Sequence, residues 1–243
     1  MIPPDHPRYR SLVTRELLAR CAESGVVALE GLTAHGRGEA FDYLLGEKTT
    51  ESALLAERTA AALLLNAQNP VISVNGNTAA LAAAEIALLQ KASGARVEVN
   101  LFHRTEERVA KIEDLLRNAG VEVFSGPAEQ LLPLSHDRAW CRREGMYAAD
   151  VVLVPLEDGD RAEVLVGMGK TVIAIDLNPL SRTARMATLA IVDELTRALP
   201  AIATACREIS PEDRVRLVKK IDNHYFLSMA IHDMTLRLSH ALD

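Results

Sequence analysis

The sequence predicts an α/β protein built on a mainly parallel sheet with helices on both faces. Short apolar runs rich in β-branched residues alternate with Ala- and Leu-rich stretches from residue 70 onward, and this alternation is typical of a doubly wound sheet. At 243 residues, the chain is long enough to bury a substantial core. We expect one α/β domain in three parts: a helical N-terminal segment (1–69), a strand–helix core (70–196) and a C-terminal helical segment (197–243).

The N-terminal segment is predicted to hold two helical stretches separated by a loop. Apolar residues share one helical face between Leu12 and Cys21, and Gly25 can end the first helix. The stretch "GLTAHGRGEAFDYLLGE" that follows contains three glycines, which favours a loop. A second helix is expected in the stretch "ESALLAERTAAALLLNA".

The core is predicted to contain six strands, each a short apolar or alternating run. The runs lie within "PVISVNGNTAAL", "ARVEVNLFHRT", "VEVFSG", "ADVVLVPL", "KTVIAIDL" and "ATLAIVDE". Residues 126–149 have no clear period and carry the single tryptophan, Trp140, so we expect an insertion there.

The C-terminal segment is predicted to form one amphipathic helix from Pro211 onward. Val218, Ile221, Tyr225 and Met229 recur at spacings of three and four residues. This apolar face is expected to pack on a neighbour, and it is one candidate for a contact between subunits.

Composition excludes several classes of protein. With 33 acidic and 27 basic residues, the net charge of −6 creates no general attraction to nucleic acid or to an anionic membrane. Three cysteines without CxxC spacing argue against a disulfide framework and a structural zinc site, and they fit a reducing cytoplasm. No apolar run approaches the ~20 residues of a membrane span, and the N-terminus lacks the apolar core of a signal peptide. We therefore expect a cytoplasmic protein that binds neither nucleic acid nor membrane.

Common catalytic motifs are absent from the sequence. It contains no GxGxxG after a strand and no GxxxxGK[ST], which argues against a dinucleotide fingerprint and a P-loop. No HExxH metal motif and no GxSxG nucleophile elbow occurs either. Function must therefore be inferred from polar clusters at strand ends, where open α/β sheets bind ligands.

The first such cluster consists of Asn75, Gly76, Asn77 and Thr78. At a strand-to-helix junction, these residues present backbone N–H groups and a helix dipole, which suits a phosphate. A helix cap without a ligand explains the same residues equally well.

The second cluster, "EDGDR" at 157–161, offers three carboxylates near a turn, as magnesium around a nucleotide would require. Adjacent acids need not point at one spot, so we favour a solvated loop. The metal ligands stay unassigned.

The third cluster, "DLNPLSRT", is the most suggestive. Asp176 and Asn178 can hydrogen-bond a ribose or base, Pro179 ends the strand, and Arg182 can make a forked contact with a phosphate. Glycines on both sides of Arg37 would likewise let the backbone approach an anion, unless this is only a flexible surface loop. The residues alone thus predict a protein that handles a phosphate or a nucleotide.

Six blocks, in the same order, resemble the archaeal 4-phosphopantoate–beta-alanine ligase family, also called phosphopantothenate synthetase. They are "HPRYRSLVTRELLARC", "GLTAHGRGEAFDYLLGE", "PVISVNGNTAAL", "VEVNLFHRTEERV", "ADVVLVPLEDGDR" and "VIAIDLNPLSRTA". The resemblance spans roughly residues 6–200 and leaves out the region around Trp140 and the C-terminal helix.

The resemblance implies a homodimer with a Rossmann-like core and an ATP-dependent ligation. It implies that 4-phosphopantoate and beta-alanine are joined into 4'-phosphopantothenate, with AMP and pyrophosphate as the other products, on the route to coenzyme A. The phosphopantoate carboxylate would attack ATP to form an acyl adenylate, from which the amine of beta-alanine displaces AMP. Arginines and Mg²⁺ would stabilise the charge on the phosphate oxygens.

The resemblance also assigns an ATP site whose three arginines are the catalytic candidates. Its residues are Arg15, Arg37, Asp176, Leu177, Asn178, Arg182, Thr183, Glu194 and Leu195. Glu194 departs from the family pattern, which has an asparagine there. On the anion-site argument rather than on the family, we expect the substrate's own phosphate at 75–78, with Arg104.

Two other functions stay open. One is a nicotinamide-dependent oxidoreductase on the same fold, against which the missing dinucleotide motif counts. The other is a non-catalytic nucleotide-binding module, which is disfavoured because three separate polar clusters suit several substrates better than one effector.

Overall fold

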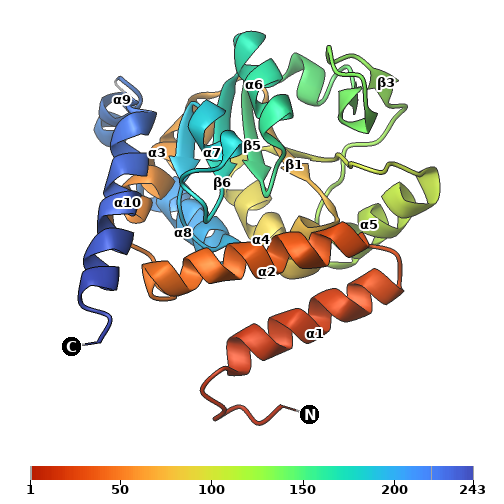
Figure 1. The fold of residues 1–243 in the computed structure, drawn as a ribbon. Helices are drawn as coiled ribbons and strands as arrows, with labels where there is room; N and C mark the ends of the chain where they lie inside the picture. Colours follow the sequence, from red (N-terminus) through yellow and green to blue (C-terminus); the bar gives the residue numbers. More distant parts are fainter. Residues whose placement is uncertain (1, 220, 243) are drawn as a thin grey trace.

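A five-stranded parallel sheet lies at the centre of the computed structural model, which describes residues 2–219 and 221–242 (Figure 1). The strands run in the order β2-β1-β5-β6-β7, and every neighbouring pair is parallel. Their bounds are β1 Pro70–Val74, β2 Arg96–Val99, β5 Val151–Pro155, β6 Thr171–Ile175 and β7 Leu189–Ile191. The predicted α/β, Rossmann-like class is confirmed.

Helices cover both faces of the sheet because successive side chains of a strand point to opposite faces. In β5, Val152 and Val154 belong to one apolar cluster, whereas Leu153 belongs to another. The helices that cover the Leu153 face are α3 Glu51–Asn66, α4 Gly76–Ser93, α5 Glu106–Asn118 and α8 Leu195–Glu208. The opposite face packs against α6 Gly159–Gly167 and α7 Arg182–Met186.

The N-terminal segment contains a helix where we predicted a loop. It holds α1 (Tyr9–Glu23), α2 (Leu29–Leu45) and α3, so the stretch "GLTAHGRGEAFDYLLGE" is mostly helical and the loop prediction is wrong. A glycine costs a helix only about 1 kcal/mol relative to alanine, and tertiary packing can outweigh that cost. In Figure 1, α2 crosses the sheet at the carboxyl ends of its strands.

Only five of the six predicted strands form. The "VEVFSG" run contributes a single bridge, between Val97 and Val123, at the edge of the sheet. Within this run only Val121 is fully buried. It therefore lacks the burial on both faces that the parallel strands have.

The insertion at 126–149 forms a small irregular unit. In it, β3 (Glu129–Gln130) pairs antiparallel with β4 (Trp140–Cys141). The unit also contains two short 3₁₀ helices, η1 (Asp137–Ala139) and η2 (Met146–Ala148). Buried side chains of this unit join the apolar cluster that also contains α6. The insertion thereby places its middle residues beside the carboxyl ends of the strands.

From Pro211 onward, the described part of the chain forms two helices rather than the single one predicted. They are α9 (Pro211–Val218) and α10 (Asn223–Ser239), and the Asp222 side chain caps α10 by accepting from the N–H of Tyr225. Val218 and Ile221 pack against the main core, whereas Tyr225 is exposed, so the predicted apolar face does not exist as one surface. No helix of the described part of the chain is long and apolar enough to cross a membrane.

Candidate functional site

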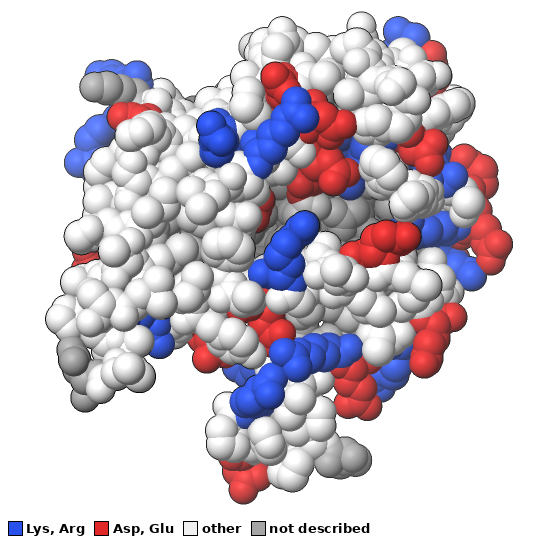
Figure 2. All heavy atoms as spheres, viewed as in Figure 1, with Lys and Arg blue, Asp and Glu red and all other residues white. Residues whose placement is uncertain are grey.

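A cleft of about 460 Å³ runs along the carboxyl ends of the strands. All five strands of the parallel sheet contribute residues that follow their ends, while α1 and α2 form the opposite wall. Figure 2 shows a hollow above α2 with acidic and basic side chains around it. The wall residues after the strands are 75–77, 101–103, 156, 158, 177 and 193–197.

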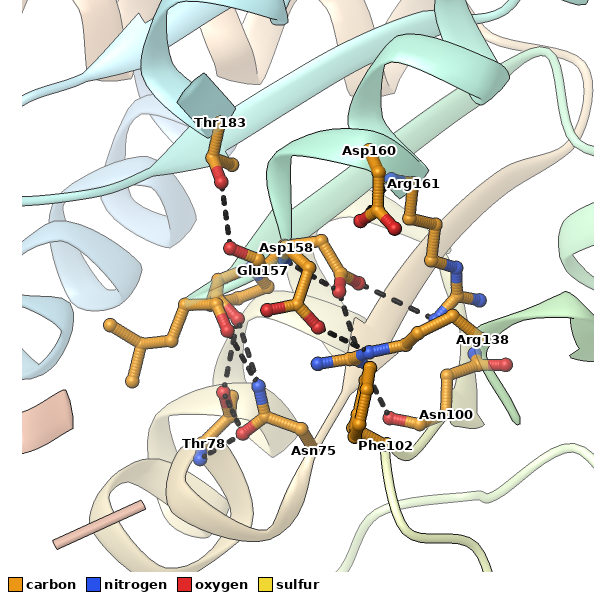
Figure 3. Close-up of polar contacts among 12 residues, drawn as sticks. Asn75, Thr78, Asn100, Phe102, Arg138, Glu157, Asp158, Asp160, Arg161 and Thr183 are labelled. Carbon is orange, nitrogen blue, oxygen red and sulfur yellow. Dashed lines mark hydrogen bonds and ion pairs between the residues drawn. The ribbon is translucent and has the colours of Figure 1, made fainter. Parts of the chain in front are cut away.

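The centre of the cleft lies where the strand order reverses, between β1 and β5. Ligands of open α/β sheets bind at such a switch point. Asn75 joins the two strand ends, since its Nδ2 donates to the carbonyl of Leu156 at 2.8 Å and its Oδ1 accepts from the N–H of Thr78 at 2.9 Å (Figure 3). The Thr78 hydroxyl is fully buried and bonded to Asn75 and Pro155, so it does not face the cleft.

The first turn of α4 is packed tightly against the segments that cover it. A Cβ at Gly76 would lie 2.2 Å from the carbonyl oxygen of Val26, so only glycine fits there. Asn77 donates from Nδ2 to the carbonyl of Gly31 at 2.8 Å, which ties α2 to α4. Gly76 and Asn77 both line the cleft.

The structure places Arg104 outside the lining of this cleft and Arg108 within it. Arg104 pairs with Glu106 at 3.0 Å, and its backbone N–H donates to Asp137. Arg108 donates instead to the carbonyls of Val26, Phe102 and His103, and its Nη2 lies 3.0 Å from where a Cβ of residue 76 would be. Arg108 was missed in the sequence, although it lies one helical turn beyond Arg104.

The "EDGDR" carboxylates do not converge. Glu157 pairs with Arg138 at 2.9 Å and with Arg161 at 3.4 Å, and Asp158 pairs with Arg138 at 2.7 Å (Figure 3). Asp160 instead contacts His136 at 2.7 Å. Within 2–219 and 221–242, no group of three or more His, Cys, Asp or Glu side chains could hold a metal ion. The side chains of Glu157 and Arg161 are buried and Gly159 begins α6, so the stretch is not the solvated loop that we favoured from the sequence.

Arg138 is a cleft residue that the sequence did not reveal. It comes from the aperiodic insertion, is only 5% exposed, and lies beside the ring of Phe102 (Figure 3). No local pattern could have indicated it, because its partners are 19 and 20 residues further along the chain.

The "DLNPLSRT" stretch forms a tight turn after β6. Asp176 accepts from the N–H of Asn178 at 2.9 Å and from the hydroxyl of Ser181, and burial raises the pKa of Asp176. Leu177 lines the cleft. The hydroxyl of Thr183 donates to the carbonyl of Glu157 at 2.7 Å, so this residue holds two strand ends together.

None of the three arginines of the predicted ATP site is among the residues that line the cleft. Arg182 pairs with Glu163 on the surface. Arg15, on α1, donates to Glu39, whose side chain lines the cleft. Arg37 is exposed on α2. Its positive charge lowers the pKa of Asp176, but burial raises that pKa by more.

The end of the cleft beside β7 is acidic. Asp193 and Glu194 line it together with Asp42 of α2, and Arg197 bonds to both aspartates. Glu194 caps α8, since it accepts from the N–H of Thr196 at 2.8 Å, and Leu195 also lines the cleft. The opposite end, beside β2, carries Arg108 and Arg138, so the two ends differ in charge.

The cysteines are not arranged for nucleophilic catalysis. All three, Cys21, Cys141 and Cys206, are buried and free. Burial raises the pKa of the Cys141 thiol to about 12 and that of Cys206 to about 11, which keeps both protonated. None of the three cysteines is therefore a candidate nucleophile.

Comparisons with known proteins agree on one family. A family model described as phosphopantothenate/pantothenate synthetase matches residues 52–237. A 4-phosphopantoate–beta-alanine ligase of Methanospirillum hungatei is 60% identical over 243 residues, covering 100% of both chains. Proteins with the same name are 56% identical in Methanosarcina mazei (96% of this chain, 94% of that protein) and 49% in Thermococcus kodakarensis (98% and 95%). These matches include the insertion and much of the C-terminal segment, which the resemblance in the sequence had left out.

Proposed function

Because the chain belongs to the phosphopantothenate/pantothenate synthetase family, we propose that it joins 4-phosphopantoate and beta-alanine into 4'-phosphopantothenate at the expense of ATP. The relatives that match its whole length are named for this ligation. The free cysteines fit a place in the reducing cytoplasm, where coenzyme A would be assembled.

The reaction needs an activated carboxylate, because a carboxylate is a poor electrophile. A carboxylate oxygen of phosphopantoate attacks the α-phosphorus of ATP, the bond between the α-phosphorus and the bridging oxygen breaks, and pyrophosphate leaves. The amine of beta-alanine, having lost a proton, then attacks the acyl carbon, and AMP leaves with the former carboxylate oxygen. No protein nucleophile takes part in this sequence.

The nucleotide is proposed to bind at the β6–β7 end of the cleft. Leu177, Glu194 and Leu195 line that end, and Asp176 and Asn178 form the turn beside it. The backbone N–H of Leu195 and the side chains around it can contact the nucleoside even though the carboxylate of Glu194 is occupied by its helix cap.

Charge on the nucleotide phosphates is proposed to be stabilised by Arg15, Arg37 and Arg182, of which Arg15 bonds to the cleft residue Glu39. Mg²⁺ typically binds through substrate phosphates with only one or two carboxylates. This mode of binding needs no cluster of metal ligands, and none is found among residues 2–219 and 221–242. Asp158 lines the cleft and is half exposed, so we propose it as the carboxylate that contacts the ion. The ion would neutralise developing negative charge on the phosphates.

The observation that carries this proposal is the single cleft across all five strand ends with its two ends of different charge. A site for one ligand needs only one strand junction, whereas three substrates need a longer cleft. Neither an oxidoreductase nor a nucleotide-sensing module is named among the matched relatives.

The test is product analysis with each substrate omitted in turn. AMP and pyrophosphate should form only when ATP, phosphopantoate and beta-alanine are all present, apart from one enzyme-bound equivalent without beta-alanine. Phosphopantoate labelled with ¹⁸O in its carboxylate should transfer one label to AMP. Formation of ADP and inorganic phosphate, with no label in AMP, would reject the acyl adenylate, and absence of any amide product would reject the ligase.

A further inference from the structure

Helix α2 forms one wall of the cleft although little of the helix is buried. In the described range 29–45, only Asp42 and Leu45 are fully buried. The middle of the helix lines the cleft with small or polar residues, namely Ala34, His35, Gly38 and Glu39. An element with few buried apolar side chains opens more easily than a packed core. α2 therefore depends on contacts near its two ends to stay over the cleft.

Those contacts differ in kind. Near the start of α2, Asn77 donates to the carbonyl of Gly31 at 2.8 Å. Near its end, Leu45 joins a small apolar cluster with α10. At the same end, Arg197 of α8 forks onto Asp42, with Nη1 donating to Oδ2 at 3.0 Å and Nη2 to Oδ1 at 2.5 Å. The two side chains are only 16% and 12% exposed, so removal of either partner would leave the other with a largely buried charge.

The same guanidinium is also fixed to the sheet. Nε of Arg197 donates to Oδ1 of Asp193, two residues beyond β7, at 2.9 Å. Asp193 in turn accepts from the hydroxyl of Thr49, in the connection between α2 and α3, at 2.6 Å. Asp42, Arg197 and Asp193 thus form a clasp that joins a lightly buried wall helix to a strand end.

We propose that Arg197 is a positioning residue: through the clasp it holds α2 over the cleft and so keeps water from the acyl adenylate. This role rests on the function proposed above. The clasp lies at the β7 end, beside the proposed nucleotide site. Closure of an active site prevents side reactions of reactive intermediates.

The side reaction here is hydrolysis of the acyl adenylate. A water oxygen attacks the acyl carbon, the bond from that carbon to the oxygen of AMP breaks, and a proton goes to solvent. Phosphopantoate is regenerated and AMP leaves, so ATP is consumed without an amide product. A loosened wall should therefore change the ratio of AMP to amide, which a loss of stability elsewhere in the protein would not change.

The experiment measures AMP and amide together, with and without beta-alanine. The wild type should form equal amounts of both. Asp42→Asn removes the charge on α2 and leaves Arg197 paired with Asp193. It should release AMP without beta-alanine about 10- to 100-fold faster than the wild type, the factor expected if loss of a hydrogen-bonded charge opens the wall. Arg197→Lys, which keeps the charge but not the fork, should also raise the ratio, and Asp42→Glu should recover part of the coupling.

Hydrogen exchange gives a second measurement that needs no catalysis. Amides at 32–40 should exchange faster in Asp42→Asn than in the wild type, and those of α5 should not. Two control variants on α5 should keep the wild-type ratio: Asp114→Asn removes an exposed carboxylate, and Ile112→Val loosens the buried core. Circular dichroism checks folding, and Arg197→Lys tests the same clasp if Asp42→Asn does not fold.

The outcomes separate this proposal from the ligase itself. Faster exchange in α2 of Asp42→Asn, in a protein that makes no amide, would keep the clasp and reject the ligase. Normal ligation with unchanged exchange and an unchanged ratio in both clasp variants would reject the clasp alone. Faster exchange with equal AMP and amide would overturn its role in excluding water. Weakened ATP binding with equal AMP and amide would make Arg197 a nucleotide contact instead.

Discussion

Glu57 on α3 is a buried acid beside the carboxylate of Asp193. It is 1% exposed and adjoins Asp193, which shares Arg197 with Asp42. Burial and then the charge of Asp193 raise the pKa of Glu57 to about 9. Two carboxyl groups can hydrogen-bond only when one holds a proton, and ionised Glu57 would leave both of its oxygens buried without a partner. With a pKa of about 9, Glu57 is expected to be neutral at pH 7 beside Asp193.

Replacing Glu57 with glutamine should stabilise the protein as the pH rises. The unfolded chain releases the Glu57 proton near pH 4.5, whereas the folded protein keeps it until about pH 9, so the wild type loses unfolding free energy between these values. Glutamine has nearly the same shape and carries no charge at any pH. The gain at pH 7 should be on the order of 3 kcal/mol, and much smaller near pH 5.

Urea unfolding of both proteins at about pH 5, 7 and 8.5 measures this difference. Glu16→Gln, which removes an exposed carboxylate from α1, should follow the wild type at all three values. If the wild type and Glu57→Gln show the same pH dependence, Glu57 does not carry a proton in the folded protein.

Arg182 must exchange partners if it binds ATP. It pairs with Glu163 on the surface, an exposed contact worth about 0–1 kcal/mol, so an ATP phosphate can compete for it. Arg182→Ala should lose about 1.5–3 kcal/mol of ATP binding, Arg182→Lys should lose less, and Glu163→Gln should bind ATP at least as tightly as the wild type. Calorimetric titration of ATP checks all three, and unchanged affinity in Arg182→Ala would leave this residue as a surface ion pair.

At the scale of the element, α2 depends on one of its three glycines. A Cβ at Gly31 would lie 2.2 Å from Oδ1 of Asn77, whose Nδ2 binds the Gly31 carbonyl, whereas a Cβ at Gly36 would meet nothing within 4 Å. The close approach at Gly31 brings α2 onto the first turn of α4. The cleft wall thus depends on a position where no side chain fits.

Gly31→Ala should therefore destabilise the protein and lower turnover, while Gly36→Ala should stabilise it by roughly 0.5–1 kcal/mol through helix propensity. Loss of the Asn77 contact should cost Gly31→Ala about 1–3 kcal/mol. Thermal melts of the two variants give the comparison. A Gly31→Ala protein as stable and active as Gly36→Ala would mean that α2 does not need this contact.

At the scale of the whole molecule, we predict a homodimer, as the family resemblance implies. The apolar face that the sequence suggested for this contact is divided between α9 and α10. On α10, however, three apolar side chains are exposed to solvent: Tyr225 by 47%, Ile231 by 39% and Leu236 by 51%. Exposed apolar side chains along one helix are typical of a protein–protein contact.

Light scattering at micromolar concentration should give twice the mass of one chain, and a mass near 26.4 kDa would reject the dimer. If α10 forms the contact, Leu236→Glu should shift the protein to the single-chain mass. Leu29→Glu changes an exposed leucine on α2 and should remain dimeric. The reverse pattern would move the interface to α2.

The strands that the sequence predicted well are those buried on both faces. The centres of the runs "ADVVLVPL" and "KTVIAID", which are "VVLVP" at 151–155 and "VIAI" at 172–175, are apolar throughout, as is typical of a parallel strand covered on both faces. The "VEVFSG" run failed because an edge position left it with one bridge. The sequence did not predict α2, which contains Gly36 and Gly38. The low helix propensity of glycine is a small free-energy term compared with the packing of α2 against α4.

The sequence by itself determined the fold class, the family, and which strand ends carry polar residues, because periodicity and motif order are properties of neighbouring residues. The tertiary structure decided which of those residues share the cleft. It turned the Thr78 hydroxyl away from the cleft, left Arg104 outside the cleft lining and placed Arg108 within it. It also brought Arg138 from the insertion onto Glu157. These choices depend on contacts between segments far apart in the chain, and a side chain's direction there is set by what packs against it rather than by its own sequence neighbours.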